Sequence, residues 1–228
     1  MIPIYMGFDP REEVGTHTFV SSVISRASRP VSFIPLHLPW FASYYSPSQR
    51  DGSNAFTYTR FLIPFLQQFR GWALFCDGAD MVCCADISEL WSLRHANMAV
   101  QVVKHEYKTL HPRKYVGTRM EADNRDYPRK NWSSLMLINC AHFAWRQMRP
   151  ETVEQMTGEE LHQFQFIPAD KVGSLPAQWN WLVDEFGENE HAKLLHWTAG
   201  IPAFPAYAHA PMADAWAREA CRVAHATA

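Results

Sequence analysis

Apolar and polar positions along the chain follow two periods, and the change between the two marks the expected elements. Short apolar runs bounded by glycine, proline or polar residues predict strands at 2–7, 31–36, 72–77, 81–84, 99–103, 135–139 and 193–197. Helical spacing and helix-favouring residues predict helices at 9–27, 56–69, 86–94, 151–164 and 213–226. The first half of the chain therefore alternates strand with helix.

Capping signals mark where several of these helices begin. Asp9 and Glu12 have the spacing of a capping box, and Asp86 and Glu89 repeat it. Pro64 predicts a kink or a boundary inside the segment that contains it. These signals strengthen the helix assignments. A capping side chain accepts hydrogen bonds from the first backbone N–H groups of a helix, and proline has no N–H to donate.

The alternation of elements predicts an α/β fold with a mostly parallel central sheet flanked by helices. Residues 37–55 are rich in proline, serine and aspartate and are expected to form a loop. Sheets of this kind bind ligands beyond the carboxyl ends of their strands. Asp9 and Asp77 each follow a predicted strand, so we expect both at that edge. The alanine-rich helix within 205–228 is expected to form a C-terminal arm packed on the domain.

Composition and charge exclude several classes of protein. The 228 residues suffice for one sizeable core, and 47% hydrophobic with 19% charged residues is typical of an ordered globular chain. Lysine plus arginine (21) nearly balances aspartate plus glutamate (23), which argues against a nucleic-acid or anionic-membrane surface. No apolar run is long enough to cross a bilayer, so we expect no transmembrane segment.

The cysteines and the first residues indicate a reducing compartment. Five cysteines form an odd set without a Cys-x-x-Cys pair, and adjacent Cys83 and Cys84 point to opposite faces of a strand. A structural zinc site is therefore not expected. The opening Met1-Ile2-Pro3 lacks the basic start and apolar stretch of a signal peptide. Free, mostly buried thiols then suit a cytoplasmic location.

The segment "LFCDGADMVCCAD" at 74–86 carries the most informative chemistry. Two acids converging at a strand end repel each other unless a cation lies between them, and oxygen ligands favour magnesium, manganese or calcium. Asp77 and Asp80 are three residues apart and would point to opposite faces of a straight strand. Both can reach one ion only if the chain turns at Gly78-Ala79, which the glycine favours. The alternative is that Asp77-Gly78 is simply a hairpin turn.

The extended segment "LFCDGADMVCCADISELW" resembles the central segment of nucleotide-sugar glycosyltransferases with the GT-A fold, especially those of family 8. In that family an apolar strand ends in Asp-x-Asp. Four more segments are similar to other parts of the family, in the same order: "PIYMGFD", "TYTRFLIPFL", "WSSLMLIN" and "LHWTAGIPAF". The matches cover 2–204, so the resemblance implies a single GT-A, Rossmann-like domain at 1–204.

The resemblance also implies the site residues. Asp77, Asp80 and His196 would bind Mn²⁺ or Mg²⁺, and Arg60 and Asp80 would be catalytic. The base and ribose of the donor would contact Gly7, Phe8 and Asp9. The rest of the donor site would comprise Tyr58, Arg60, Ser133, Ser134 and Gly200, to which we add Asn180 and Lys104 as further candidates.

The sequence departs from the family pattern at several positions. The metal motif has one extra residue, and the sugar-binding asparagine of the family falls on Trp132, which implies a changed sugar pocket. The lysine expected after Gly200 is absent, so Lys104 or Arg60 would neutralise phosphate instead. The family's Asp-Gln-Asp motif is missing, and "LHQFQF" stands near its place.

Several candidates also have a simpler structural interpretation. Asp9 has the position of a helix cap, and His196 fits a hydrogen-bonded core histidine. Asn180 fits a turn cap, alongside its candidate role in binding sugar hydroxyls. Lys104 fits the solvated edge of a strand. Ser133, together with the serine that follows it, fits a role in satisfying backbone groups at a strand start.

We therefore expect a metal-dependent, hexosyltransferase-type glycosyltransferase that moves a sugar from a UDP-sugar or similar nucleotide-diphosphate donor to a hydroxyl of a glycan, lipid-linked or small-molecule acceptor. The resemblance implies retention of configuration; an inverting enzyme would need a carboxylate base, for which Asp184 and Glu185 are available. One alternative is a non-catalytic nucleotide-sugar or carbohydrate binder with a degenerate metal site. A weaker one is a metal-dependent phosphohydrolase.

Overall fold

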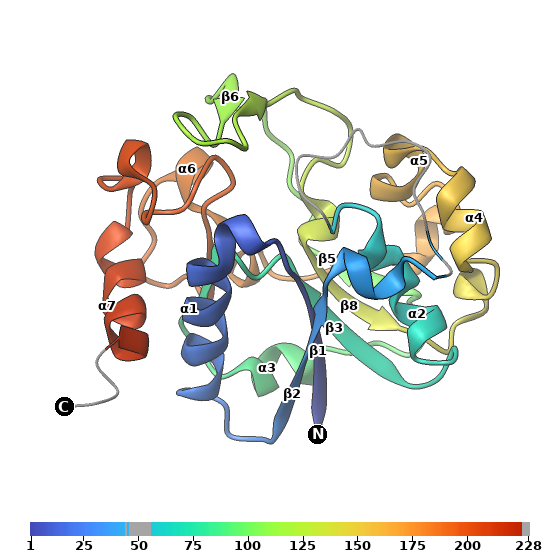
Figure 1. The fold of residues 1–228 in the computed structure, drawn as a ribbon. Coiled ribbons are helices and arrows are strands. Elements are labelled where there is room, and N and C mark those ends of the chain that lie inside the picture. Colours follow the sequence, from blue (N-terminus) through green and yellow to red (C-terminus); the bar gives the residue numbers. More distant parts are fainter. Residues whose placement is uncertain (44, 46–55, 225–228) are drawn as a thin grey trace.

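A six-stranded sheet lies at the centre of the fold (Figure 1). The computed structural model describes residues 1–43, 45 and 56–224. In order across the sheet the strands are β2 (Val31–Leu36), β1 (Ile2–Gly7), β3 (Trp72–Cys76), β8 (Leu135–Asn139), β5 (Val100–Val102) and β9 (Val172–Ser174). Three of the five pairings are parallel, and β8 is antiparallel to both of its neighbours. The predicted α/β fold is confirmed.

Helices cover both faces of this sheet (Figure 1). The α-helices are α1 (Glu13–Ile24), α2 (Ile63–Leu66), α3 (Ile87–Ser92), α4 (Pro150–Gln155), α5 (Gly158–His162), α6 (Val183–Phe186) and α7 (Ala213–Ala224). The 3₁₀ turns are η1 (Pro10–Glu12), η2 (Leu38–Phe41), η3 (Thr59–Leu62), η4 (Trp132–Ser134), η5 (Phe143–Trp145), η6 (Ala169–Lys171), η7 (Ala177–Trp179) and η8 (Pro205–Tyr207). The predicted loop at 37–55 contains η2, and its positions 44 and 46–55 lie outside the described residues.

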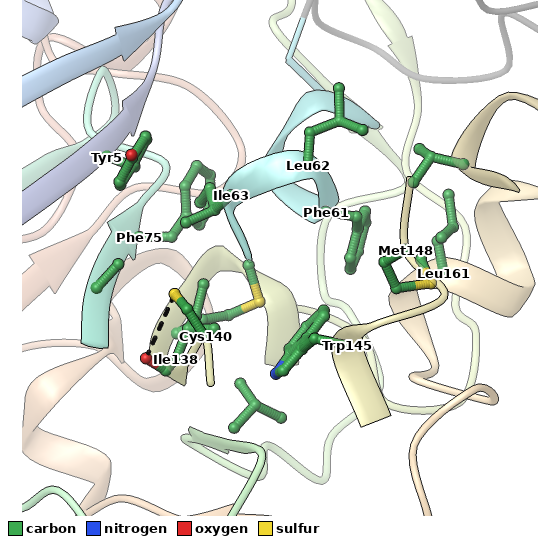
Figure 2. Close-up of a cluster of buried hydrophobic side chains, with 14 of the residues drawn as sticks. Tyr5, Phe61, Leu62, Ile63, Phe75, Ile138, Cys140, Trp145, Met148 and Leu161 are labelled. Atoms are coloured by element: carbon green, nitrogen blue, oxygen red, sulfur yellow. Dashed lines mark hydrogen bonds between the residues drawn. The ribbon is translucent and has the colours of Figure 1, made fainter. Parts of the chain in front are cut away.

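Alternation along the strands divides the core into two layers. Ile4 of β1 points to the layer that also holds Phe19 of α1, whereas the next residue, Tyr5, points to the opposite layer. Figure 2 shows that second layer, where Phe61 and Trp145 fill the space between the sheet and the helices around α2. Because adjacent side chains fill different layers, a one-residue shift of β1 would exchange its two faces.

The helix predicted as one element at 151–164 is instead two. α4 ends at Gln155, and α5 begins at Gly158 after a new N-terminal cap. The Thr157 hydroxyl accepts a hydrogen bond from the Glu160 backbone N–H, and the Glu160 carboxylate accepts one from the Thr157 backbone N–H. This capping box starts a second helix where the spacing of apolar residues alone indicated one continuous helix.

Two smaller sheets complete the fold. One consists of β10 (Trp181–Leu182), β11 (Leu194–His196) and β4 (Met81–Cys83), and the other is a hairpin of β6 (Arg113–Lys114) and β7 (Ala122–Asp123). The hairpin, β10 and the edge strand β9 of the central sheet were not predicted, because strands of two or three residues carry no periodic signal.

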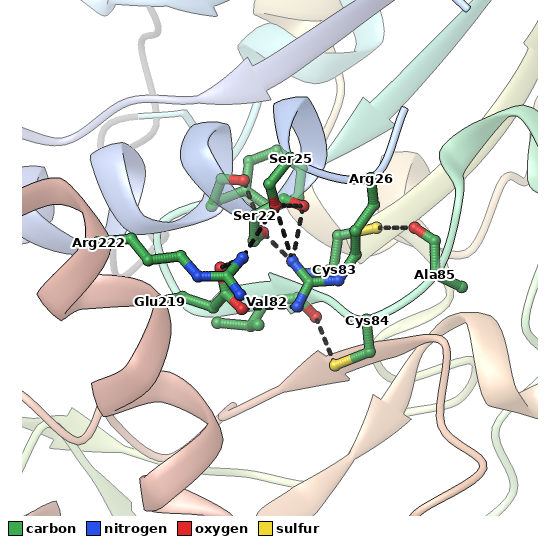
Figure 3. Close-up of polar contacts among 10 residues, drawn as sticks. Ser22, Ser25, Arg26, Val82, Cys83, Cys84, Ala85, Glu219 and Arg222 are labelled. Atoms are coloured by element: carbon green, nitrogen blue, oxygen red, sulfur yellow. Dashed lines mark hydrogen bonds and ion pairs between the residues drawn. The ribbon is translucent and has the colours of Figure 1, made fainter. Parts of the chain in front are cut away.

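The C-terminal helix α7 lies along α1 (Figure 1). Arg26, just after α1, donates a 2.6 Å hydrogen bond to Glu219 of α7, whose side chain is 5% exposed. Figure 3 shows this ion pair beside the backbone N–H of Cys83, which donates to the Ser22 hydroxyl. The division of the chain at residue 204 stays a prediction. In the described part of the chain, none of the helices has the length and apolar character needed to cross a membrane.

Candidate active site

The turn between β3 and β4 brings two aspartates into one cleft. Asp77 directly follows β3 and Asp80 directly precedes β4. Gly78 has a φ of 82°, a left-handed conformation that glycine adopts at little cost. The predicted turn is therefore confirmed, and both carboxylates line the cleft despite their three-residue spacing. Since β3 and β4 belong to different sheets, the turn does not join a hairpin.

The extra residue of this turn is accommodated by a glycine on α1. A Cβ added at Gly15 would lie 1.8 Å from the backbone oxygen of Ala79. The turn therefore packs directly on the helix backbone, where no side chain fits. Helix α1 and the acidic turn thus support each other.

His196 joins the two aspartates because β11 pairs with β4, opposite Met81. Its Nε2 lies 3.2 Å from Asp80 Oδ2, and its Nδ1 lies 2.9 Å from the amide oxygen of Asn180. That oxygen can only accept, so the network assigns the ring proton to Nδ1. Burial opposes the charged form of His196, but the carboxylates of Asp80, Asp77 and Asp184 together outweigh it and raise the histidine pKa. The Nε2 atom faces the acidic turn.

Arg60 of η3 holds the first aspartate from the opposite side. Its Nη1 lies 2.7 Å from Asp77 Oδ1 and donates a 2.9 Å hydrogen bond to the Ser133 carbonyl oxygen. The guanidinium also packs over the Phe75 ring at 4.8 Å. Burial nevertheless raises the pKa of Asp77 to about 6, because desolvation of the carboxylate exceeds the stabilisation by Arg60.

The chemistry of these residues fits a divalent cation. Ligand atoms of Asp77, Asp80 and His196 all lie within 4.8 Å of one another. Asp80 Oδ1 is buried without a hydrogen-bond partner among the described residues, and an uncompensated buried carboxylate oxygen is costly. Two carboxylates and an imidazole whose second nitrogen is held by Asn180 form an ordinary ligand set for such an ion.

A cleft of about 790 Å³ opens in front of this cluster. The Ser133 hydroxyl and the His162 ring line it together, with Oγ and Nδ1 2.6 Å apart. Burial, reinforced by Arg60 and Lys114, holds the pKa of His162 well below its usual value. The histidine is therefore a neutral partner for the serine. The Ser134 hydroxyl accepts a 2.8 Å hydrogen bond from Asn180, which links the serine pair to His196.

Glu12 is a further buried acid beside this site. Its side chain is 1% exposed, and Oε1 has no hydrogen-bond partner among the described residues. The pKa of Glu12 is well above its usual value, because burial and the charges of Asp80, Asp9 and Asp77 all disfavour ionisation. The capping box predicted for Glu12 is not formed; Asp9 caps η1 by accepting from the Arg11 backbone N–H.

The predicted base-binding residues lie at the end of β1, next to the end of β3. A Cβ at Gly7 would lie 2.4 Å from the Phe56 ring, so that ring covers the glycine backbone. Asp9 is buried, and its carboxylate accepts from the Arg11 side chain at 2.8 and 2.5 Å. Tyr58 is also buried, just before η3.

Aromatic side chains continue from this point toward the surface. Phe8 meets His37 edge to face at 5.2 Å, and His37 meets Trp40 at 5.4 Å. Trp40 is 64% exposed. An exposed indole beside a strand end offers a planar face for a base, and the sequence did not single it out.

Of the ten predicted donor residues, only Arg60, Ser133 and Ser134 belong to the cleft lining, and Lys104 and Gly200 are among those that do not. Lys104 is exposed, with its ammonium 5.6 Å from the centre of the Trp132 ring. At Gly200 an added Cβ would lie 2.4 Å from the Tyr207 ring. Packing against this ring therefore explains the glycine without a contact to the donor. The roles of Lys104 and Gly200 toward a donor stay predictions.

The acids considered for an inverting mechanism are engaged elsewhere. The Asp184 carboxylate accepts from the Ala199 backbone N–H at 2.9 Å, and Glu185 accepts from Leu110 N–H and the Thr109 hydroxyl. Neither Asp184 nor Glu185 lines the cleft. Burial raises the pKa of Asp184 to about 6.

Sequence reasoning missed Lys114, Tyr127, Lys130 and His162 of the cleft lining. Of these four residues, only His162 could have been found from the sequence. It belongs to "LHQFQF", the segment that stands near the place of the missing Asp-Gln-Asp motif. The others reach the cleft from the segment around the β6–β7 hairpin, which has no periodic pattern.

The chain matches no protein-family model. It is 36% identical over 224 residues to Protein CDI of Arabidopsis thaliana, an alignment that covers 95% of this chain and 85% of that protein. The chain belongs to the Protein CDI family. The name of this relative states no activity, so chemistry has to be argued from the fold and the site.

Known structures with similar folds are glycosyltransferases. The bifunctional glycosyltransferase WbbM has a TM-score of 0.63 at 16% identity, over 96% of this chain and 49% of that one. GlyE of Streptococcus pneumoniae has a TM-score of 0.63 at 12% identity, over 96% and 60%. The galactosyltransferase LgtC, with donor and acceptor sugar analogues, has 0.55 at 15%, over 96% and 95%. The chain thus spans about half of WbbM and 60% of GlyE. The fold is GT-A.

Proposed function

We propose that this protein is a metal-dependent glycosyltransferase that moves a sugar from a UDP-sugar donor to a hydroxyl acceptor. The observation that carries the proposal is the cluster of Asp77, Asp80 and His196 at the base of a large cleft in a GT-A fold. The phosphohydrolase alternative lacks a comparable argument, because no second feature of the cleft favours it.

The cluster would hold Mn²⁺ or Mg²⁺, and such an ion, when bound, neutralises a diphosphate leaving group. Arg60 keeps Asp77 in place through its 2.7 Å ion pair, and Asn180 orients His196. This ion pair and this hydrogen bond hold Asp77 and His196 in place before the donor binds. Electrostatic catalysis requires groups that are oriented in advance in this way.

The donor would extend from the end of β1 to the serine pair. Gly7, Phe8 and Asp9 would contact the base and ribose, with Tyr58 nearby and Gly200 close to the diphosphate. The transferred sugar would contact Ser133 and Ser134, whose hydroxyls are oriented by His162 and Asn180.

We also propose that configuration is retained. The two carboxylates that the sequence offered for an inverting base, Asp184 and Glu185, hydrogen bond with backbone groups and do not line the cleft. Apart from the metal cluster, three other carboxylates do line it, and each already has a side-chain partner: Asp123, Asp126 and Glu159. NMR of the product anomers tests this assignment, and an inverted product would contradict it.

Calorimetric titration of UDP, with and without Mn²⁺, tests the donor site. Wild type should bind UDP only with Mn²⁺, and Asp80→Ala should lose that binding at least 100-fold, because a charged ligand contact is removed. Asp170→Ala, which removes a 73% exposed carboxylate on η6, should leave UDP binding unchanged. UDP binding that ignores both Mn²⁺ and the Asp80 substitution would instead indicate a binder with a defunct metal site.

A further inference from the structure

The cationic side chains that line the cleft have different partners. Arg60 is paired with Asp77. The ammonium of Lys130 lies 2.8 Å from the amide oxygen of Asn124 and 3.5 Å from Asp126.

Lys114 differs in what its charge faces. It is the last residue of β6, it is half-buried, and it lines the cleft together with Asp77, Asp80 and His196. Burial lowers the pKa of Lys114, while the carboxylates of Asp77 and then Asp80 act most strongly in the opposite direction. Lys114 therefore shares the cleft with the acidic cluster, and its charge interacts with both carboxylates.

The start of the hairpin loop, directly after β6, is tied to the segment that follows His196. The backbone N–H of Tyr115 donates a 2.7 Å hydrogen bond to the Ala199 carbonyl oxygen. The backbone N–H of Val116 donates a 2.9 Å bond to the Tyr207 hydroxyl. Lys114 therefore precedes two anchored residues, and its position relative to the metal cluster is fixed by the fold.

Charge balance at the cluster calls for such a group. Asp77 and Asp80 offset a divalent cation, and Arg60 adds one positive charge at Asp77, which leaves a single excess positive charge. A donor diphosphate carries several negative charges, so a further cation near the cluster strengthens its binding in a low-dielectric cleft.

We propose that Lys114 binds the diphosphate of the nucleotide donor, in the role for which the sequence offered Lys104. This inference rests on the proposed function, because it assumes a nucleotide-diphosphate ligand. Lys104 cannot serve equally well where it lies, since its ammonium stacks on Trp132 outside the cleft lining.

Calorimetry with two separate ligands tests the proposal on Lys114→Met, with Lys114→Arg to keep the charge. In saturating Mn²⁺, Lys114→Met should bind UDP about 10- to 100-fold more weakly than wild type, and Lys114→Arg should recover most of that loss. Mn²⁺ alone should bind Lys114→Met about 2- to 10-fold more tightly, because a like charge near the two aspartates is gone. Damage to the fold would weaken both ligands together.

Two further variants provide the comparison. Lys171→Met removes a partly exposed lysine paired with Asp170, far from the cleft lining, and should match wild type. Lys104→Met should also match wild type. UDP affinity of Lys114→Met within twofold of wild type, or a loss confined to Lys104→Met, would overturn the proposal. So would a joint loss of Mn²⁺ and UDP binding that Lys114→Arg does not restore.

Failure of the proposed function gives a different result. If wild type does not bind UDP in Mn²⁺, the donor assignment is wrong, and inorganic diphosphate with Mn²⁺ becomes the deciding probe for Lys114. Diphosphate binding that weakens in Lys114→Met still supports the contact. Equal diphosphate binding by the two proteins, or none by wild type, rejects it.

Discussion

Asp77 experiences two opposing influences that make its charge sensitive to its surroundings. Arg60, 2.7 Å away, favours the carboxylate, whereas burial favours the neutral acid and raises the pKa to about 6. A metal ion must displace the proton from this group, so cation binding and proton release are coupled.

Mn²⁺ affinity should therefore fall as the pH drops, first because His196, whose pKa is raised, must lose its proton to bind the ion. Below about pH 6 each ion must also displace a proton from Asp77, so the fall should approach a hundredfold per pH unit. Calorimetry between pH 5 and 8 in two buffers of different ionisation enthalpy measures both the affinity and the proton count. Asp184 also has a pKa of about 6, so Asp184→Asn, which keeps an acceptor for Ala199, is the matched control. If that variant lost the pH dependence, Asp77 would not be its source.

The same pKa shift has a defined sign for stability. The folded state keeps the Asp77 proton at a pH where the unfolded chain has already lost it. The contribution of Asp77 to the stability of the metal-free protein is therefore largest below about pH 4, and it is lost as the pH rises to about 6.

At the residue scale the sequence predicted that Asp77 and Asp80 lie together, because a turn at Gly78 lets both carboxylates reach one place. Metal binding by this cluster stays a prediction. The role of His196 came from the resemblance, and the pairing of β11 with β4 explains its position. Lys114 was not predictable, because it reaches the cleft from a hairpin whose sequence shows no hydrophobic periodicity.

At the scale of elements, the contact between α1 and the acidic turn determines where the carboxylates point. Gly15 lies in the first turn of α1, and within a helix alanine is ordinarily more stable than glycine by up to about 1 kcal/mol. Here the space for a Cβ is taken by a backbone oxygen, which cannot rotate away as a side chain would.

Gly15→Ala should therefore destabilise the protein by about 1–3 kcal/mol, opposite in sign to the helix-propensity effect, and should weaken Mn²⁺ binding by moving the turn. Urea denaturation and Mn²⁺ calorimetry measure the two effects. Val14→Ala, which alters an exposed neighbour on the same helix, should change neither by a comparable amount. A higher free energy of unfolding for Gly15→Ala would contradict this prediction, since it would show that the turn can move away from the added methyl group without destabilising the protein.

The predicted bounds of strands were correct where an apolar run is bounded by turn residues, and the predicted helix was wrong where a local capping box divides it. β1, β2 and β8 have the predicted bounds, because runs of apolar residues between turn residues define them. The segment 151–164 divides at Thr157 because the capping box outweighs the apolar spacing.

At the scale of the whole molecule, the first helix and the last are joined by one buried carboxylate. Glu219 is 5% exposed on its side chain and meets two arginines, Arg26 at 2.6 Å and Arg222 at 3.4 Å. Arg26 is 26% exposed and Arg222 55% exposed, so the first pair is shielded and the second is solvated.

Arg26→Met should loosen α7 and destabilise the protein by about 1–3 kcal/mol, because it leaves Glu219 buried without its close partner. Arg222→Met should cost less than about 0.5 kcal/mol. Thermal unfolding and limited proteolysis around 205–224 measure the difference, and UDP binding should be retained in both variants. Equal effects of the two substitutions would contradict a specific stabilising role of the Arg26–Glu219 ion pair.

The packing of Gly15 against Ala79 also has a consequence for related sequences. We expect a chain with the ordinary Asp-x-Asp spacing to lack this close approach of the turn to the first helix. Its first helix would then have a gap that alanine or a larger side chain can fill. Insertion in the acidic motif and loss of a side chain at position 15 should thus covary among homologues, so that the length of one loop can be inferred from the size of a residue more than sixty positions away.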